Sequence, residues 1–504
     1  MGFSIVSAVI FLPILGAALI AFIPGLTRNW IRTLALVFTG VAFALGIAIF
    51  IGFNRTVSGM QFEEMTSWIP ALNAFYHVGL DGISMPLFVL TTFLGLMVVL
   101  ISWKETTRIR EYFAWLLLLE ASILGVFGSL DLLLFFIFWE IEIIPMYFLI
   151  SIWGSGRKQY SSIKYVLYTL FGSAFMLAGI LTVYFTTGSL NMVELARTGV
   201  TPYASTIPAV AMFFLLIVGF AIKLPVFPLH TWLPDAHTDA PTAGSVMLAG
   251  ALIKMGGYGI IRICVSFFPD IARQYSLLFI ILAVVGIVYG AAVTLRQTDL
   301  KRLIAYSSVS HMGMVLLGVF AFSQVSFTGA VLQMVSHGLL TGLLFAMAGF
   351  TMHSAGERDL RKLGGLARQM PVACVVFSIA ALGSLGLPLT SGFAAEFITF
   401  VGSFSSTVFH GINVFVIVAA IGVVLGAGYL LWMIQQVFYG PPKPQFGGDG
   451  HGHGTAPAVE LTHVHDADAL EKVYMFAFII LIILIGVYPS LLTEIIKLGI
   501  APLV

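Results

Sequence analysis

The stretch of sequence that decides the fold is an apolar segment interrupted by a lysine and several prolines, FAIKLPVFPLHTWLPDAH at residues 220–237. Pro225 and Pro228 cannot donate backbone hydrogen bonds, so a helix that contains them leaves carbonyl groups unpaired. Such a broken helix is tolerated in a membrane only where it lies against protein or a water-filled cavity. The segment therefore predicts a broken transmembrane helix, and a structural re-entrant turn over residues 228–241 is the alternative.

The composition of the whole chain favours the membrane interpretation. Of its 504 residues, 59% are apolar and only 9% are charged, and the mean hydropathy is +1.02. Soluble domains carry about a quarter charged residues, so this chain cannot cover an ordinary water-facing surface. A transmembrane helix needs roughly 20 apolar residues, and the apolar runs divide into about fourteen spans. We predict an all-α polytopic membrane protein with broken seventh and twelfth spans, the twelfth at GSLGLPLTSGFAAE (383–396).

Several classes of function are excluded or disfavoured by the sequence. The net charge of +1 leaves no basic surface for nucleic acid. Cys264 and Cys374 form no C-x-x-C pair, so neither an iron–sulfur cluster nor a disulfide is indicated. Walker A and G-x-G-x-x-G motifs are missing, so a nucleotide site is not supported. We expect no cofactor and no metal in this chain. A Gly-rich setting favours a solvated loop over a metal site for a group of histidines at His451, His453, His463 and His465.

The basic residues predict how the spans are oriented. Most of the 24 Lys and Arg residues fall in the loops that follow odd-numbered spans. The other loops hold Arg55, Arg197, Arg273 and Lys497. Cytoplasmic loops carry the excess of Lys and Arg. We therefore expect a multi-pass protein of a prokaryotic inner (plasma) membrane with both termini outside the cytoplasm.

The spacing of the ionisable residues predicts an internal repeat. Glu140 precedes Lys223 by nearly the same number of residues as His311 precedes Glu396, and each interval joins an intact span to a broken one. Two five-helix units of opposite orientation give this spacing, as in transporters built from inverted repeats. The predicted parts are three N-terminal helices (1–110), a first repeat of helices 4–8 (111–266), a second repeat of helices 9–13 (267–438), and the Gly/His-rich loop with helix 14 (439–504).

Ionisable side chains within the spans are the main functional signal. A charge at the bilayer centre costs roughly 2.5–3.5 kcal/mol on insertion scales, so such residues usually mark ion pathways. A buried glutamate can hold a proton near neutral pH, a buried lysine can switch between ammonium and amine, and histidine titrates nearest neutrality. The alternatives are structural ion pairs for the charged residues and hydrogen-bonded core residues for the histidines. For Glu396 the alternative is a helix cap at the membrane surface. The candidate proton carriers are Glu140, Lys223, Lys254, His311, His337 and Glu396.

Two further glutamates are not assigned to this group. Glu142 lies two residues from Glu140, about 200° around a helix, so both side chains cannot face one channel. We expect Glu142 to meet another subunit or to be partly solvated. Glu120 has no placed partner and ranks behind the six candidates.

Four motifs carry a resemblance to a known family. They are FWE with PMY within residues 138–147, the segment from KLP (223–225) to the histidine at 237, HMG at 311–313 and HG at 337–338. With these motifs the chain resembles, over nearly its whole length, the antiporter-like membrane subunits of respiratory complex I. The resemblance implies fourteen helices with inverted five-helix repeats, a Glu–Lys pair at Glu140 and Lys223, a central Lys254 and an exit residue at Glu396.

The residue at position 396 indicates which type of subunit within this family the chain resembles. Subunits of the L and N types and of the multisubunit cation/proton antiporters generally carry lysine there, whereas M-type (chain 4) subunits carry glutamate, as this chain does. Glu142 departs from the family pattern. The resemblance implies partners among the other complex I membrane subunits, with L-like and N-like subunits on either side, and surrounding lipids. It places NADH, FMN, iron–sulfur clusters and quinone elsewhere in the complex.

The predicted function is proton translocation coupled to NADH:quinone electron transfer in other subunits. When Glu140 moves away from Lys223, the proton of Lys223 passes through Lys254 and the histidines toward Glu396. A subunit of a multisubunit Na⁺/H⁺ antiporter and one of a membrane-bound ferredoxin- or hydrogenase-linked complex are the alternatives, followed by a passive scaffold. A solute carrier is disfavoured because the ionisable groups are strung along the repeats and do not converge on one site.

Overall fold

The computed structural model describes residues 5–204, 207–441 and 464–503, and this part of the chain is mostly helical. Within it, 12 helical segments are long and apolar enough to cross a membrane. Of the Gly/His-rich loop, His451, His453 and His463 lie outside the described residues. The unbroken spans are α1 (Ile5–Phe22), α2 (Arg28–Gly52), α3 (Ser84–Ile101), α4 (Ile109–Gly128), α5 and α6 (Leu132–Ile141 and Ile143–Trp153), α7 (Lys158–Thr187), α11 to η4 (Thr242–Val265), α14 (Ser276–Thr294), α15 (Leu300–Phe320), α16 (Gln324–Ala355), α19 with η6 (Ile412–Tyr439) and α20 (Ala469–Val487).

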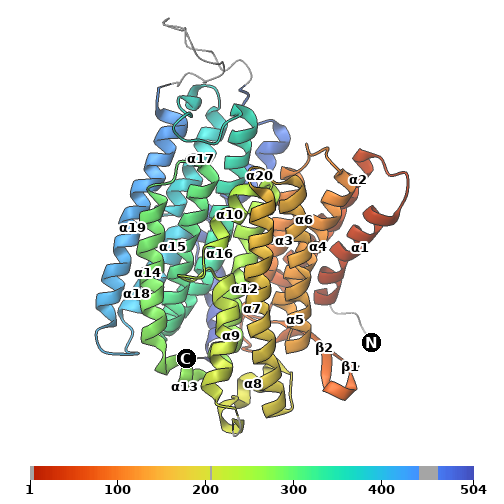
Figure 1. Cartoon of the computed structure of the whole chain (residues 1–504), viewed down its shortest axis with the longest axis vertical. Helices are drawn as coiled ribbons and strands as arrows, with labels where there is room; N and C mark the ends of the chain where they lie inside the picture. Colours follow the sequence, from red (N-terminus) through yellow and green to blue (C-terminus); the bar gives the residue numbers. More distant parts are fainter. Residues whose placement is uncertain (1–4, 205–206, 442–463, 504) are drawn as a thin grey trace, which may run out of the picture.

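Two further spans are broken at the predicted places. The first consists of α9 (Ala209–Lys223) and α10 (Trp232–Asp239), and the second of α17 (Pro371–Ser384) and α18 (Ser391–Phe404). Each first half ends shortly before a proline, which cannot continue the ladder of backbone hydrogen bonds. The two broken spans run in opposite directions through the bundle (Figure 1). With them the described chain crosses the bundle about fourteen times, and the prediction of inverted repeats with broken helices 7 and 12 is confirmed.

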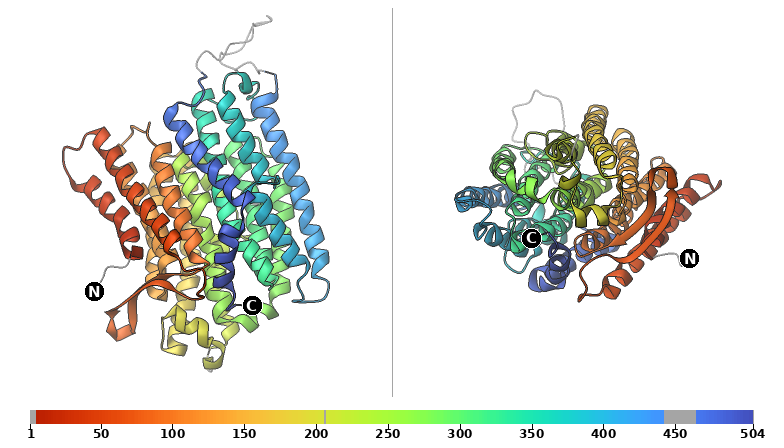
Figure 2. Two further views of the ribbon diagram at one scale, coloured as in Figure 1. Left: turned by 180° about the vertical axis from the view of Figure 1, so that it is seen from behind. Right: turned by 90° about the horizontal axis from the view of Figure 1, so that it is seen from below.

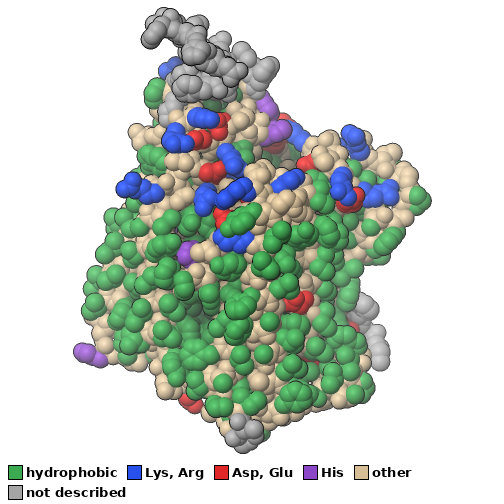
Figure 3. Space-filling view, in the orientation of Figure 1, with side chains coloured by type: hydrophobic (Ala, Val, Ile, Leu, Met, Phe, Trp, Pro, Cys, Tyr) green, Lys and Arg blue, Asp and Glu red, His purple; other side chains and the backbone are tan. Residues whose placement is uncertain are grey.

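The two ends of the bundle differ in charge. A hydrophobic band covers the middle of the face in Figure 3, and Lys and Arg side chains gather above it, at the end of the bundle where α17 begins. We call this the basic end. α1 begins and α21 (Ser490–Ile500) ends at the opposite end.

Short elements close the opposite end. A β-hairpin of β1 (Gln61–Ile69) and β2 (Ala74–Leu80) lies there together with α8 (Met192–Thr198) and α13 (Pro269–Gln274). The hairpin turns at Asn73, whose φ of 50° is a left-handed conformation that asparagine tolerates. These strands are an addition to the predicted all-α membrane part, because they lie outside the spans on which the sequence analysis rested.

The helices that carry the ionisable candidates form the centre of the bundle. The spans Thr242–Val265, α15 and α16 are mostly buried, whereas fewer than half of the residues of α2 and of α19 are buried. α1 and α2 lie at one edge and α19 at the other (Figure 2). Glycines allow the central helices to approach closely, since a Cβ on Gly338 would meet the carbonyl oxygen of Gly250 at 2.6 Å.

Candidate functional site: buried ionisable residues along the bundle

The first cluster surrounds Lys223, which is the last residue of α9 and is 1% exposed. Its ammonium donates to the carboxylate of Glu142, which is fully buried. The hydroxyl of Tyr165 donates to the other oxygen of that carboxylate at 2.6 Å and lies 3.4 Å from the lysine nitrogen. The ring of Trp139 lies 5.6 Å from the same nitrogen. The cluster is therefore a buried ion pair enclosed by aromatic side chains.

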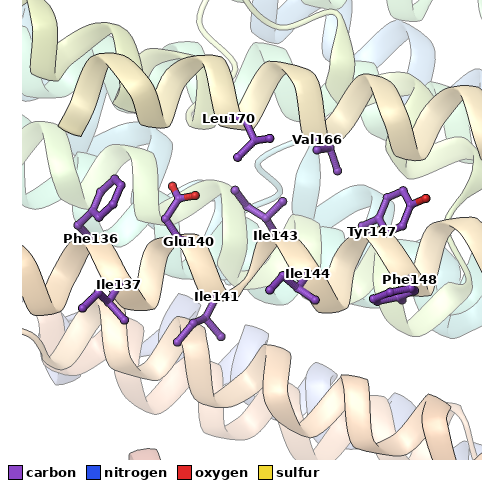
Figure 4. Close-up of a pocket in the computed structure, with 10 residues that line it drawn as sticks. All are labelled: Phe136, Ile137, Glu140, Ile141, Ile143, Ile144, Tyr147, Phe148, Val166 and Leu170. Atoms are coloured by element: carbon purple, nitrogen blue, oxygen red, sulfur yellow. The ribbon is translucent and has the colours of Figure 1, made fainter. Parts of the chain in front are cut away.

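The predicted pairing of Lys223 with Glu140 is wrong in this structure, and so is the expected environment of Glu142. Glu140 lies in the last turn of α5 and Glu142 is the residue that joins α5 to α6, and the two side chains face different sides, as their spacing requires. Glu142 is fully buried against Lys223. Glu140 points into a groove beside α7 (Figure 4). The sequence identified the turn of helix correctly but not which of its faces lies against Lys223.

The groove at Glu140 is large and almost wholly apolar. Its volume is about 640 Å³, and its walls come from α5, α6 and α7, with Ile144 half exposed. One carboxylate oxygen of Glu140 is buried without a hydrogen-bond partner among the described residues. The residues that line it are Phe136, Ile137, Glu140, Ile141, Ile143, Ile144, Tyr147, Phe148, Val166 and Leu170.

The second cluster begins at Lys254, which is fully buried in α12 (Ile253–Gly259). A π-helical turn, η3 (Leu248–Leu252), precedes it, and the lysine ammonium donates to the Ala249 carbonyl that this turn contains. Such π-turns often occur at functional sites. The lysine nitrogen also lies 2.7 Å from Nδ1 of His337. Lys254 is thus held between a backbone carbonyl and an imidazole.

The contacts continue from His337 to the second broken helix. The rings of His337 and His311 lie 5.5 Å apart, and Nδ1 of His311 is 3.3 Å from a carboxylate oxygen of Glu396. Nε2 of His311 lies 3.2 Å from the hydroxyl of Ser384. Glu396 is 6% exposed, so the alternative of a cap at the membrane surface does not hold. A cavity of about 10 Å³ beside His311 and Glu396 has room for about one water molecule.

The two clusters lie on helices that are packed together. A Cβ on Gly256 in α12 would meet the backbone nitrogen of Leu224 at 2.5 Å. Gly256 is two residues from Lys254, and Leu224 follows Lys223. The glycines next to Lys254 therefore bring its helix against the break in the first broken span.

Some buried polar residues were missed by the sequence analysis or ranked low. His237 is fully buried, stacks on Phe345 with 4.5 Å between ring centres, and has no hydrogen-bond partner for either ring nitrogen among the described residues. Lys301 is 2% exposed and donates to the Ala240 carbonyl at 2.8 Å. Glu120 is 1% exposed beside Gly95. Their signal in the sequence is a polar residue within an apolar span.

The described residues contain no group of three or more His, Cys, Asp or Glu side chains that could hold a metal ion. The side chains of the two clusters are ionisable or carry hydroxyl groups, which are groups that can accept and donate protons.

Comparisons with known proteins identify the family of the chain. Residues 129–422 match the family model of the transmembrane NADH:quinone oxidoreductase and Mrp antiporter proteins. The chain is 38% identical to NADH-quinone oxidoreductase subunit M of Rhodobacter capsulatus, over 99% of this chain and 96% of the relative. It is 41% identical to NAD(P)H-quinone oxidoreductase chain 4 of a Nostoc species, over 86% of this chain and 81% of the relative.

Solved structures share the fold. A chain of respiratory complex I from Thermus thermophilus is 28% identical and superposes with a TM-score of 0.83, over 98% of this chain and 99% of that one. A chain of the Mrp complex from Dietzia is 23% identical with a TM-score of 0.86, over 99% of this chain and 97% of that one, which shows the fold alone.

Proposed function

Because this chain belongs to the transmembrane family of NADH:quinone oxidoreductase and Mrp antiporter subunits, we propose that it is a proton-translocating membrane subunit of complex I, of the M (chain 4) type. It takes part in the translocase reaction without holding a redox cofactor. NADH oxidation and quinone reduction, with the FMN and iron–sulfur clusters they need, take place in other subunits.

The observation that carries this proposal is the close succession of four buried ionisable residues. Lys254 lies within hydrogen-bond distance of His337, the ring of His337 lies against that of His311, and His311 lies 3.3 Å from a carboxylate oxygen of Glu396. Each member can accept and release a proton, and each lies on a different central helix. Burial at the centre of a membrane protein is costly for such groups, so their alignment is best explained by proton transfer along them.

The ion pair at Lys223 supplies the control step. While Glu142 and Tyr165 hold the ammonium, the lysine keeps its proton. A shift of α5 and α6 that separates Glu142 from Lys223 leaves a buried cation without its anion. The proton then moves through water to Lys254 and on to Glu396. In this scheme Glu142 takes the direct role that the sequence gave to Glu140.

Glu140 remains a member of the proposed relay at its outer end. An isolated carboxyl group in an apolar groove is unfavourable in contact with lipid tails. We place a neighbouring antiporter-like subunit, L-like or N-like, against this groove, with the second such subunit on the other side. A movement of that neighbouring subunit against Glu140 would also move Glu142, because Glu142 lies only two residues further along the chain.

The orientation follows from the charge of the two ends. We place the basic end in the cytoplasm and both termini outside, in the inner membrane of a prokaryote. Residues 111–266 and 267–438 are the two proposed repeats, with residues 1–110 and 439–504 flanking them.

A subunit of a multisubunit cation/proton antiporter is the second candidate, since the Mrp chain shares the fold. Glu396 favours the complex I assignment, because lysine is expected at this position in the antiporter proteins.

The test is to extract the chain in mild detergent through an affinity tag and to identify what accompanies it. Flavin and iron–sulfur signals with NADH:quinone reductase activity would support the proposal. A few small hydrophobic partners without a redox centre would contradict it and would assign the chain to an antiporter.

A further inference from the structure

The helix that carries Lys254 presents two more polar side chains toward the opposite end of the bundle. Tyr258 and Arg262 follow Lys254 at intervals of four residues, which places the three on one helix face. Tyr258 is fully buried and Arg262 is 6% exposed. Arg262 lies about two helical turns beyond Lys254 along the axis. This polar face leads from the central lysine toward the opposite end, and the proposed relay does not use it.

Tyr258 and Arg262 contact each other and polar groups of neighbouring elements. Arg262 pairs through Nη2 with an oxygen of Asp81 at 2.5 Å, and its Nε donates to the Tyr258 hydroxyl at 3.2 Å. The hydroxyl in turn donates to the carbonyl of Phe127 at 3.5 Å. The other oxygen of Asp81 accepts the backbone N–H groups of residues 83 and 84 at 3.0 Å each, where α3 begins. We call these three side chains the Asp81–Arg262–Tyr258 cluster.

A chain of groups conducts protons only if each group accepts a proton and passes one on. Arginine carries donors alone and is not deprotonated in proteins, so a guanidinium in the chain stops transfer. The Tyr258 hydroxyl accepts from Arg262 and makes only a long contact, at 3.5 Å, with the backbone carbonyl of Phe127. Asp81 is neutralised by the guanidinium, which removes the attraction that a free carboxylate would exert on protons from the opposite end.

We propose that the Asp81–Arg262–Tyr258 cluster insulates Lys254 from the aqueous phase at the opposite end of the bundle. A proton on Lys254 then leaves only through His337, and protons from the opposite end do not return directly to Lys254. This inference rests on the proposed function, since it requires Lys254 to carry protons. Arg262 is a positioning and insulating residue, and it takes no part in the transfer itself.

The experiment measures passive proton backflow in liposomes that contain the complete complex. A proton gradient is built by NADH oxidation, the NADH is exhausted, and the decay of the gradient is followed with a pH-sensitive dye in the presence of valinomycin and potassium. Arg262→His places a titratable group between Lys254 and the opposite end of the bundle, because histidine both accepts and donates protons near neutral pH. Arg262→Lys keeps the charge. Asp81→Asn combined with Arg262→Met removes both charges and leaves a side chain that does not conduct.

Backflow several-fold above wild type is expected for Arg262→His, and wild-type backflow for Arg262→Lys and for the double variant. The matched control is Arg273→His, at an exposed arginine near the opposite end. Adding Lys254→Met to Arg262→His should abolish the leak. Wild-type backflow in an assembled Arg262→His complex would overturn the proposal. So would equal leaks in Arg262→His and the double variant, or a leak that persists with Lys254→Met. The effect of Lys254→Met alone on NADH-driven pumping tests the proposed function separately.

Discussion

Replacing Glu142 by glutamine removes the carboxylate that Lys223 contacts and leaves a buried ammonium without an anion. Glu142 is fully buried and Lys223 is 1% exposed, so solvent cannot compensate for the loss. Removing one partner of a buried ion pair costs about 3–5 kcal/mol. Glu140 faces the outer groove (Figure 4) and acts on Lys223 only through its charge, because the ion pair of Lys223 is with Glu142. We expect Glu140→Gln to cost less than about 1 kcal/mol, as for most substitutions outside buried networks.

The assay compares the two variants in the purified complex. Intact complex is measured by native gel after stepwise heating, and proton pumping is measured per NADH oxidised in liposomes. Glu142→Gln should lower the dissociation temperature well below that of Glu140→Gln, and both should lose pumping by this subunit. Combining Glu142→Gln with Lys223→Met removes both charges, which is often close to neutral for stability. This double variant should recover the dissociation temperature without recovering pumping.

The reasoning would be refuted by equal dissociation temperatures for Glu142→Gln and Glu140→Gln. A larger loss for Glu140→Gln would show that Glu140 is the true partner of Lys223. Wild-type pumping in the double variant would show that the ion pair has no part in proton transfer.

Three further predictions concern the relay and the basic end. Glu396→Gln should block proton release, whereas Glu396→Lys should retain part of the pumping rate because lysine also titrates; both are measured in liposomes. His337→Phe should interrupt transfer between Lys254 and His311 while the complex still assembles, and pumping at the wild-type rate would contradict the order of the relay. At the start of α20, Asp468 accepts the backbone N–H of Glu471 at 2.8 Å and pairs with Lys104, and these contacts hold the pKa of Asp468 below its ordinary value. The stabilising contribution of Asp468 is therefore present at neutral pH and is lost as the pH falls through the lowered pKa. Asp468→Ala should lower the free energy of unfolding by about 1 kcal/mol and leave pumping unchanged. The thermal stability of this variant should be less sensitive to acid than that of the wild type.

Much of the fold follows from the sequence because a membrane restricts the choices. Apolar runs in a bilayer form helices, since every backbone group must be paired within the protein. The breaks at Lys223 and before Glu396 were marked by proline and glycine inside such runs. The β-hairpin at residues 61–80 lies between the apolar spans α2 and α3, where this restriction does not apply, and it was not predicted.

The site was predicted less completely, because pairing depends on how helices rotate. Glu140 and Glu142 lie on nearly opposite sides of one helix, and their spacing alone does not tell which side faces the core. The buried residues Phe135, Phe138 and Trp139 lie on the side of Glu142, and that pattern becomes informative once the burial is known. The contacts of Lys254, His337, His311 and Glu396 join four helices, and the sequence indicated their members but not their order in space.

The most direct test of the central claim is proton pumping by a complex that carries Lys223→Ala. The account predicts that the complex assembles and contains its redox cofactors, but that the protons translocated per NADH fall because the control step is lost. A pumping stoichiometry equal to wild type in the assembled variant would contradict the claim that protons pass under the control of this lysine.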